Sequence, residues 1–218
     1  MNESLKIKVG DVVLEGELNI PENPTGLIIF SHGSGSSRFS PRNRLVSQFL
    51  NENGFGTFLF DLLTQEEDQV YETRFDIGLL SERLEKVTRY LLKLPEINNL
   101  SFGYFGASTG AASALIAASK LQTKIKAVVS RGGRPDMASG YLEDVKAPSL
   151  LIVGELDFDV LKLNQEAFEQ LICQKSLMII GGATHLFEEP GTMAQVAELS
   201  LEWFLKHLSP KESEQSLF

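Results

Sequence analysis

The chain has 218 residues, 43% of them hydrophobic, and a formal net charge of −9. This length supports one sizeable core, so we expect a single domain over residues 1–208 and a polar tail over 209–218. Nucleic acids and anionic membranes are disfavoured as partners because both require clustered basic charge. The start of the chain lacks the basic and apolar regions of a signal peptide, and no apolar run approaches about 18 residues, so the sequence predicts a cytoplasmic protein.

Two strands, Leu5–Val9 and Val12–Ile20, are predicted first, reversed at Gly10-Asp11 into an antiparallel hairpin. Six further strands are expected at Gly26–Phe30, Gly56–Phe60, Leu100–Phe105, Ile125–Ser130, Ser149–Val153 and Ser176–Ile180. Five helices are expected at Pro41–Asn53, Ile77–Leu94, Ser108–Lys120, Val160–Cys173 and Pro190–His207. Short apolar strands that alternate with helices indicate an α/β fold, a mostly parallel sheet of about eight strands with helices on both faces.

Three other segments carry expectations of their own. The connection from Arg131 to Pro148 is too short for a separate lid domain but can hold one short helix near 141–145, which favours an open site and small substrates. Residues 62–76 are acidic and form either a flap or a solvated loop. Cys173 is the only cysteine, so internal disulfides are impossible; it lies beside Leu171 and Ile172 in a predicted helix and is expected in the core rather than in chemistry.

The motif Gly106-Ala107-Ser108-Thr109-Gly110 lies between a predicted strand and a predicted helix. A serine on a tight strand-to-helix turn stands clear of its own backbone and can act as a nucleophile when a base takes its proton. The two glycines allow that turn and close packing of the helix on the sheet. Ser108 is therefore the candidate nucleophile.

His185 is the candidate base, because it follows the last predicted strand in a glycine-rich loop. His207 ends the last helix, where a cation favours the helix dipole. A third group must orient the imidazole, and Asp157 follows the preceding strand. Asp159 and Glu155 compete for that role, and Asp157 alternatively caps the next helix.

Backbone N–H groups are expected to stabilise the oxyanion that forms when Ser108 attacks a carbonyl. One is that of Thr109, at the helix start. The second belongs to the loop 31–37, where Gly33 and Gly35 let the backbone turn inward, with Ser34 as first choice and Gly35 as second. His32 is expected to hold this loop rather than to act as an acid or base. No metal or cofactor is expected, since no element shows metal-ligand spacing.

Six of the eight arginines follow the carboxyl ends of predicted strands; they are Arg38, Arg42, Arg44, Arg74, Arg131 and Arg134. Arg42 and Arg44 begin a helix, where positive charge opposes the helix dipole by about 0.3 kcal/mol or more. One interpretation is an anionic substrate bound by Arg38 or Arg131 beside Gly33 and Gly35. The alternative is pairing with acids on the same side of the sheet.

The order Ser108, Asp157, His185, each after its own strand, is that of an α/β-hydrolase. Together with His32-Gly33-Ser34-Gly35, it makes nearly the whole chain resemble the dienelactone-hydrolase-like group of that superfamily. Dienelactone hydrolases carry cysteine as nucleophile, whereas this chain has serine, so their lactone chemistry is not carried over. The serine form is more similar to carboxylesterases and thioesterases.

The predicted function is therefore a serine hydrolase that cleaves a small ester, thioester or lactone through an acyl-enzyme. An acyltransferase would use the same three residues, and a non-catalytic binding module could keep the fold without turnover. The expected partner is a small-molecule acyl substrate.

Overall fold

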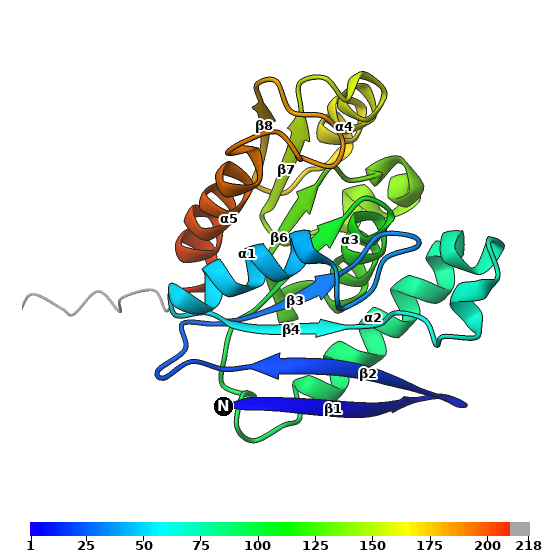
Figure 1. The fold of residues 1–218 in the computed structure, drawn as a ribbon, viewed down its shortest axis with the longest axis vertical. Coiled ribbons are helices and arrows are strands. Elements are labelled where there is room, and N and C mark those ends of the chain that lie inside the picture. Colours follow the sequence, from blue (N-terminus) through cyan, green and yellow to red (C-terminus); the bar gives the residue numbers. More distant parts are fainter. Residues whose placement is uncertain (210–218) are drawn as a thin grey trace, which may run out of the picture.

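The structure, a computed structural model, describes residues 1–209 and builds them around one eight-stranded sheet (Figure 1). The strand order is β1-β2-β4-β3-β5-β6-β7-β8. Only β2 runs antiparallel to its neighbours β1 and β4; the other pairs are parallel. The strands are β1 (Asn2–Val9), β2 (Val12–Asn19), β3 (Leu27–Ser31), β4 (Gly56–Phe60), β5 (Phe102–Ala107), β6 (Ile125–Arg131), β7 (Ser149–Gly154) and β8 (Lys175–Ile180). The predicted hairpin and mostly parallel sheet are confirmed.

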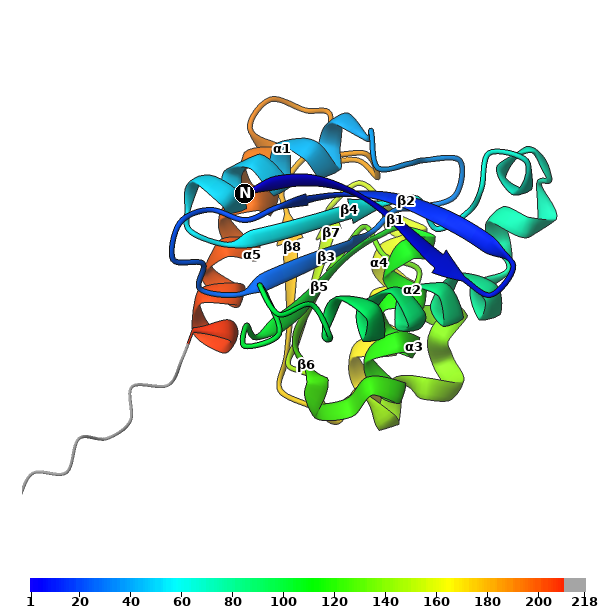
Figure 2. The same cartoon turned by 90° about the horizontal axis from the view of Figure 1, so that it is seen from below.

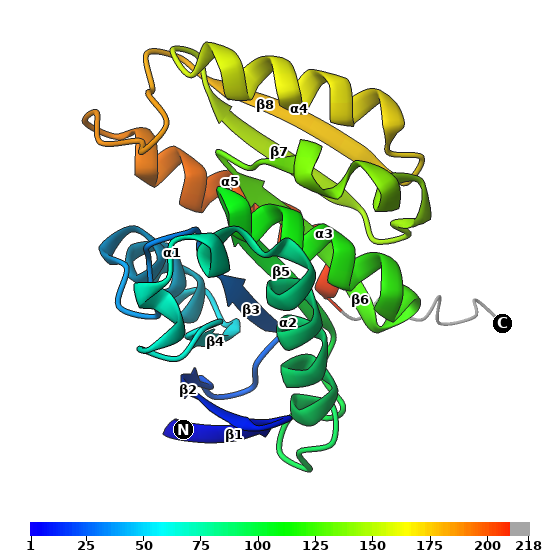
Figure 3. The same ribbon diagram turned by 90° about the vertical axis from the view of Figure 1, so that its right-hand side faces the viewer.

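Five α-helices cover the two faces of the sheet, because β3 to β7 are apolar on both sides and must be buried on both. The helices are α1 (Pro41–Glu52), α2 (Ile77–Leu91), α3 (Thr109–Leu121), α4 (Phe158–Gln170) and α5 (Thr192–Leu208). One hydrophobic core lies under α1 and α5, and a second lies under α2, α3 and α4. Figures 2 and 3 show α1 and α3 on opposite sides of the sheet. Among residues 1–209, no helix is long and apolar enough to cross a membrane.

Helix α4 ends three residues earlier than predicted, at Gln170, so Cys173 lies outside it in a connection to β8. Leu171 turns to an extended backbone. The Lys175 ammonium group binds the carbonyl oxygens of Phe168 and Leu171 and so satisfies the end of the helix. A side chain from the next strand therefore sets this boundary. Of the predicted tail 209–218, all but Ser209 lies outside the described residues.

The connection after β6 holds the 3₁₀ helix Pro135–Asp144, which begins earlier than the short helix predicted near 141–145 and leaves no large lid. The acidic segment 62–76 forms two short 3₁₀ helices, and Glu67 anchors it. The carboxylate oxygens of Glu67 lie 2.6 and 2.5 Å from the guanidinium nitrogens of Arg83. Arg83 is a buried side chain of α2 and also donates to the carbonyl of Leu62. This segment is attached to the core rather than free.

Replacing Glu67 by glutamine is expected to lower the free energy of unfolding at pH 7 by about 2 kcal/mol, because it leaves the buried Arg83 cation without its partner. Hydrogen bonding to Arg83 lowers the pKa of Glu67 from 4.5 to about 2. The stabilisation is therefore present above about pH 4.5 and is lost as the pH falls towards 2. Urea unfolding at pH 7 and pH 3 measures it. Glu66→Gln removes an exposed carboxylate next door and is the matched control; equal effects of the two changes would contradict the prediction.

Candidate active site

Ser108 lies at the turn between β5 and α3 with a left-handed backbone, φ 51° and ψ −123°. Its N–H donates to the carbonyl of Arg131, 3.1 Å away, and its own carbonyl accepts from the N–H groups of Ala111 and Arg134. Such a conformation costs of order 1–3 kcal/mol in a residue other than glycine and persists where the surroundings enforce it. The fold therefore holds Ser108 at the carboxyl edge of the sheet, as the motif predicts.

The glycines of the motif are required by close backbone approaches. A Cβ atom on Gly106 would lie 2.5 Å from Cα of Ala111, and one on Gly110 would overlap the carbonyl oxygens of Ser31 and His32. Gly33 also comes close, because a Cβ there would lie 3.1 Å from Cβ of Ser108. The loop after β3 thus passes directly beside the candidate nucleophile.

His185 and Asp157 form a hydrogen bond above the ends of β7 and β8, with 2.6 Å between His185 Nδ1 and Asp157 Oδ2. The Asp157 side chain is 13% exposed and makes no capping bond to α4, which counts against the helix-cap alternative. The two competing acids, Glu155 and Asp159, are exposed. Asp157 is therefore the acid that can fix the tautomer of His185, with a proton on Nδ1 and Nε2 free to accept.

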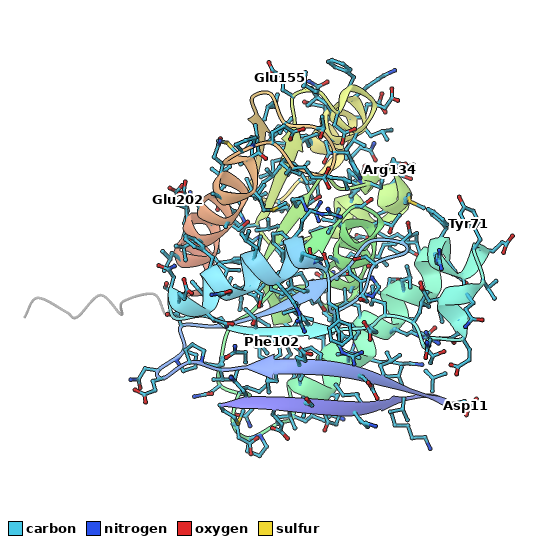
Figure 4. The ribbon with its side chains drawn as sticks, viewed as in Figure 1. Asp11, Tyr71, Phe102, Arg134, Glu155 and Glu202 are labelled. Atoms are coloured by element: carbon cyan, nitrogen blue, oxygen red, sulfur yellow. The ribbon has the colours of Figure 1, made fainter. Side chains whose placement is uncertain are left out.

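The loop that carries His185 is held by two acidic side chains and one buried aromatic ring, none of which the sequence singles out for this purpose. Glu155 accepts a hydrogen bond from the N–H of Gly182 at 2.7 Å, and Figure 4 shows it at the end of the sheet that carries this loop. Glu189 accepts from the N–H and the hydroxyl of Thr184. Phe187 is buried and has φ 54°, so the loop packs its side chain inward at the cost of backbone strain.

Gly132, directly after β6, brings the base and the nucleophile to one place. A Cβ there would lie 3.5 Å from Nδ1 and Cε1 of His185, while the preceding carbonyl binds the N–H of Ser108. The imidazole therefore packs on the backbone beside the serine. Within residues 1–209, Ser108 Oγ makes no hydrogen bond to His185; hydrogen bonds between a nucleophile and its base are often long without substrate and tighten when it binds.

Of the candidate oxyanion donors, Ser34 already has a partner: its N–H donates to Thr109 Oγ1 at 2.8 Å. Ser34 can serve a substrate carbonyl only if that hydroxyl gives up the bond. The N–H of Gly35 has no hydrogen bond to any described residue and is free to donate. The N–H of Thr109, in the first turn of α3, is free by helix geometry.

His32 is buried and holds the loop after β3 in place. Its Nε2 accepts from the N–H of Leu62 at 3.0 Å, so the other ring nitrogen carries the proton and donates to the carbonyl of Gly33 at 2.9 Å. Burial lowers the pKa of His32 and keeps it neutral. These contacts support the positioning role expected from the sequence.

The internal-pairing alternative describes most of the arginines. Arg38 binds the carboxylates of Asp61 and Glu15, so its charge is paired within the protein. Arg134, labelled in Figure 4, binds Asp136 through two nitrogens. Carboxylate partners are also present for Arg42, Arg44, Arg74, Arg83 and Arg89.

Arg131 differs from all of them. The residue is only 5% exposed, and its guanidinium makes no hydrogen bond or ion pair with any described residue. The Phe187 ring lies 5.8 Å away, a cation–π contact that contributes about 2 kcal/mol when desolvated. Burying an unpaired ion costs several kcal/mol, so most of that cost is not balanced by the protein. Burial, with the charge of Arg42 as second cause, lowers the pKa of Arg131 to about 10 and leaves it a cation at neutral pH.

Two other features do not include Ser108. Cys173 contacts Ser149 at the start of β7, the opposite edge of the sheet, and burial raises the pKa of its thiol. A cavity of about 620 Å³ is lined by Arg38, Asp61 and neighbouring residues but not by the serine. In the part of the chain that the structure describes, no group of three metal-binding side chains comes together.

A family model of the dienelactone hydrolase family matches residues 14–208. The chain belongs to the dienelactone hydrolase family. The crystal structure of a dienelactone hydrolase from Anabaena variabilis superimposes with a TM-score of 0.93 at 50% identity, over 95% of this chain and 98% of that one. Est1E from Butyrivibrio proteoclasticus shares the fold, with a TM-score of 0.80 at 18% identity over 93% of this chain and 98% of its own. Membership supports hydrolase activity and confirms the α/β-hydrolase fold.

Two curated proteins from strains of Mycobacterium tuberculosis are 51% identical to this family member over 207 residues. Each bears the name "Putative phosphoribosyl transferase". The match covers 95% of this chain but 47% of those proteins, so the chain spans about half the length of the curated relatives. The activity in their name is therefore that of proteins about twice as long as the segment that this chain matches.

Proposed function

We propose that the protein is a serine hydrolase that cleaves a small ester, thioester or lactone through an acyl-enzyme. The observation that carries the proposal is the 2.6 Å bond between Asp157 and His185, on a loop packed beside the strained turn of Ser108. A histidine that acts as the base for a serine needs a carboxylate to orient its ring. Asp157 binds His185 in this way and does not cap its own helix, α4. Cys173 is too remote to replace the serine.

In the proposed reaction, Ser108 Oγ attacks the substrate carbonyl while His185 Nε2 takes its proton. The N–H of Thr109 and an N–H of the loop 33–35 stabilise the oxyanion. His185 then returns the proton to the departing alcohol or thiol as its bond to the acyl carbon breaks. Water, deprotonated by His185, attacks the acyl-enzyme; His185 then gives that proton to Ser108 Oγ as its bond to the acyl carbon breaks, which releases the acid and restores Ser108. Asp157 orients the imidazole and stabilises its cationic form throughout.

Incubation with a fluorophosphonate probe at neutral pH tests the nucleophile. We expect a single adduct on the peptide that contains Ser108 and none in Ser108→Ala, because only an activated serine displaces fluoride from the probe. Ser119→Ala, a buried serine of α3, is the matched control and should keep the adduct. An unmodified Ser108 would remove the enzyme interpretation and favour a binding module.

The acyl group and the acceptor are tested by a panel of short acyl esters, thioesters and lactones. A hydrolase releases the free acid in water at the same rate whether or not an alcohol or amine acceptor is added. An acyltransferase shows turnover that depends on the acceptor. The product distribution separates these two uses of the same residues.

A further inference from the structure

The guanidinium of Arg131 is a buried positive charge that the protein does not neutralise. It lies on the α1 and α5 side of β6, the side that Val129 and Ala127 also face, with its cation over the ring of Phe187. Its Nε is completely enclosed without a partner. Its two terminal nitrogens are not among the enclosed atoms and have no described partner, and a planar pair of donors of this kind suits the oxygens of an anionic ligand.

A second guanidinium approaches the same place from α1. Repulsion by Arg42 is the second cause of the lowered pKa of Arg131, and the Nε of Arg42 is also enclosed without a partner. Its one carboxylate, on Glu188, lies 3.3 Å away and is 64% exposed, which makes the pair weak in water. Glu188 follows Phe187 in sequence, so Arg42, Glu188, Phe187 and Arg131 form one cluster. Two cations and one solvated carboxylate leave this cluster net positive.

The cluster adjoins the candidate catalytic residues. The carbonyl of Arg131 accepts the N–H of Ser108, and the next residue, Gly132, packs against the His185 ring. Phe187 is two residues beyond His185. These backbone contacts place the end of β6 that carries Arg131 beside Ser108, so one small molecule can hold its anionic group at the arginines and its carbonyl at Ser108.

We propose that Arg131 and Arg42 bind a phosphate group carried by the acyl substrate. A phosphate monoester has a charge of about −1.5 to −2 at pH 7 and three acceptor oxygens, enough to bond both guanidinium groups and to displace the solvated carboxylate of Glu188 from Arg42. A carboxylate has one charge and two acceptor oxygens and would leave Arg42 paired with Glu188. The proposal rests on the proposed function for the reaction at Ser108, but binding of the anion does not require turnover.

Binding is tested first in the inactive Ser108→Ala protein with inorganic phosphate, by calorimetry and by thermal unfolding. We expect phosphate to raise Tm, and Ser108→Ala/Arg131→Gln to bind it at least tenfold more weakly. Ser108→Ala/Arg44→Gln is the matched control, because Arg44 lies on the same helix but is bound by both carboxylate oxygens of Glu17. If Arg131→Gln fails to fold, Ser108→Ala/Arg42→Gln gives the same comparison. Phosphate binding that is unchanged by both arginine substitutions would overturn the proposal.

Selectivity is tested with three acetate esters of one alcohol length that end in phosphate, carboxylate or hydroxyl. The wild type is expected to show a kcat/KM at least tenfold higher for the phosphate ester than for the hydroxyl ester, with the carboxylate ester between them. In Arg131→Gln that ratio should fall close to one. A preference for the carboxylate ester would overturn the choice of phosphate. A ratio that stays the same in Arg131→Gln would show a structural role instead. If no ester is cleaved while phosphate binding still depends on Arg131, the proposed function fails and the phosphate site stands.

Discussion

Replacing His185 by alanine is expected to lower kcat/KM for a short acyl ester by about 10⁴-fold or more, because Ser108 loses the base that takes its proton. The bond between His185 and Asp157 positions that base, and the backbone of Gly132 supports the ring. Steady-state kinetics at neutral pH measures the loss. The remaining activity would reflect substrate binding and the oxyanion donors alone.

The same change at His207 is the matched control. His207 lies in the last turn of α5 against Trp203, at the edge of the sheet opposite Ser108. His207→Ala is expected to keep kcat/KM within about twofold of the wild type when assayed well below Tm, since only packing against an aromatic ring is lost. A loss in His185→Ala no larger than that in His207→Ala would refute the assignment of the base.

The order of strands and helices could be predicted because most strands are short, continuous apolar runs that end at glycine or polar residues. Strand β1 shows the limit of this approach. The apolar pattern predicts a start at Leu5, whereas the strand begins at Asn2, and its exposed, polar first residues carry no such pattern. Only the register with β2, in which Asn2 pairs with Asn19, makes them a strand. Edge strands depend on backbone pairing that composition does not reveal.

Ser108, His185 and Asp157 could be proposed from the sequence because each follows a strand of one parallel sheet, and the carboxyl ends of such strands meet. The bond between the Ser34 N–H and Thr109 Oγ1 could not, since it joins the loop after β3 to the first residue of α3, 75 residues away. It occupies the N–H of Ser34, the first choice for the second oxyanion donor, whereas the N–H of Gly35, the second choice, has no hydrogen bond to any described residue.

Which arginine stays without a carboxylate partner also could not be predicted from the sequence. From the sequence, Arg38 and Arg131 are equivalent candidates for binding an anion. In the structure Asp61 and Glu15, from the end of β4 and from β2, neutralise Arg38, whereas no acid among the described residues reaches Arg131. Which cation stays unpaired depends on the packing of elements that are distant in the chain.

Replacing Gly110 by alanine is expected to abolish the native fold, with a loss of more than about 4 kcal/mol in the free energy of unfolding. A Cβ at this position would overlap the carbonyl oxygens of Ser31 and His32, which are backbone atoms of β3 and the loop after it. Neither can move without breaking the pairing of β3 with β5 or separating α3 from the sheet. Overpacking against a side chain costs about 1–3 kcal/mol because the side chain can shift, and backbone has no such freedom.

Gly140→Ala is the matched control, because Gly140 lies in the 3₁₀ helix after β6, is exposed and has no atom within 4 Å of the position that a Cβ would take. We expect it to change the free energy of unfolding by no more than about 1 kcal/mol. Circular dichroism and urea unfolding of both variants measure the difference. A folded Gly110→Ala protein with near wild-type stability would show that the turn can open at this contact. In that case Gly110 would have no packing role, and only the backbone conformation of Ser108 itself would fix the position of that serine.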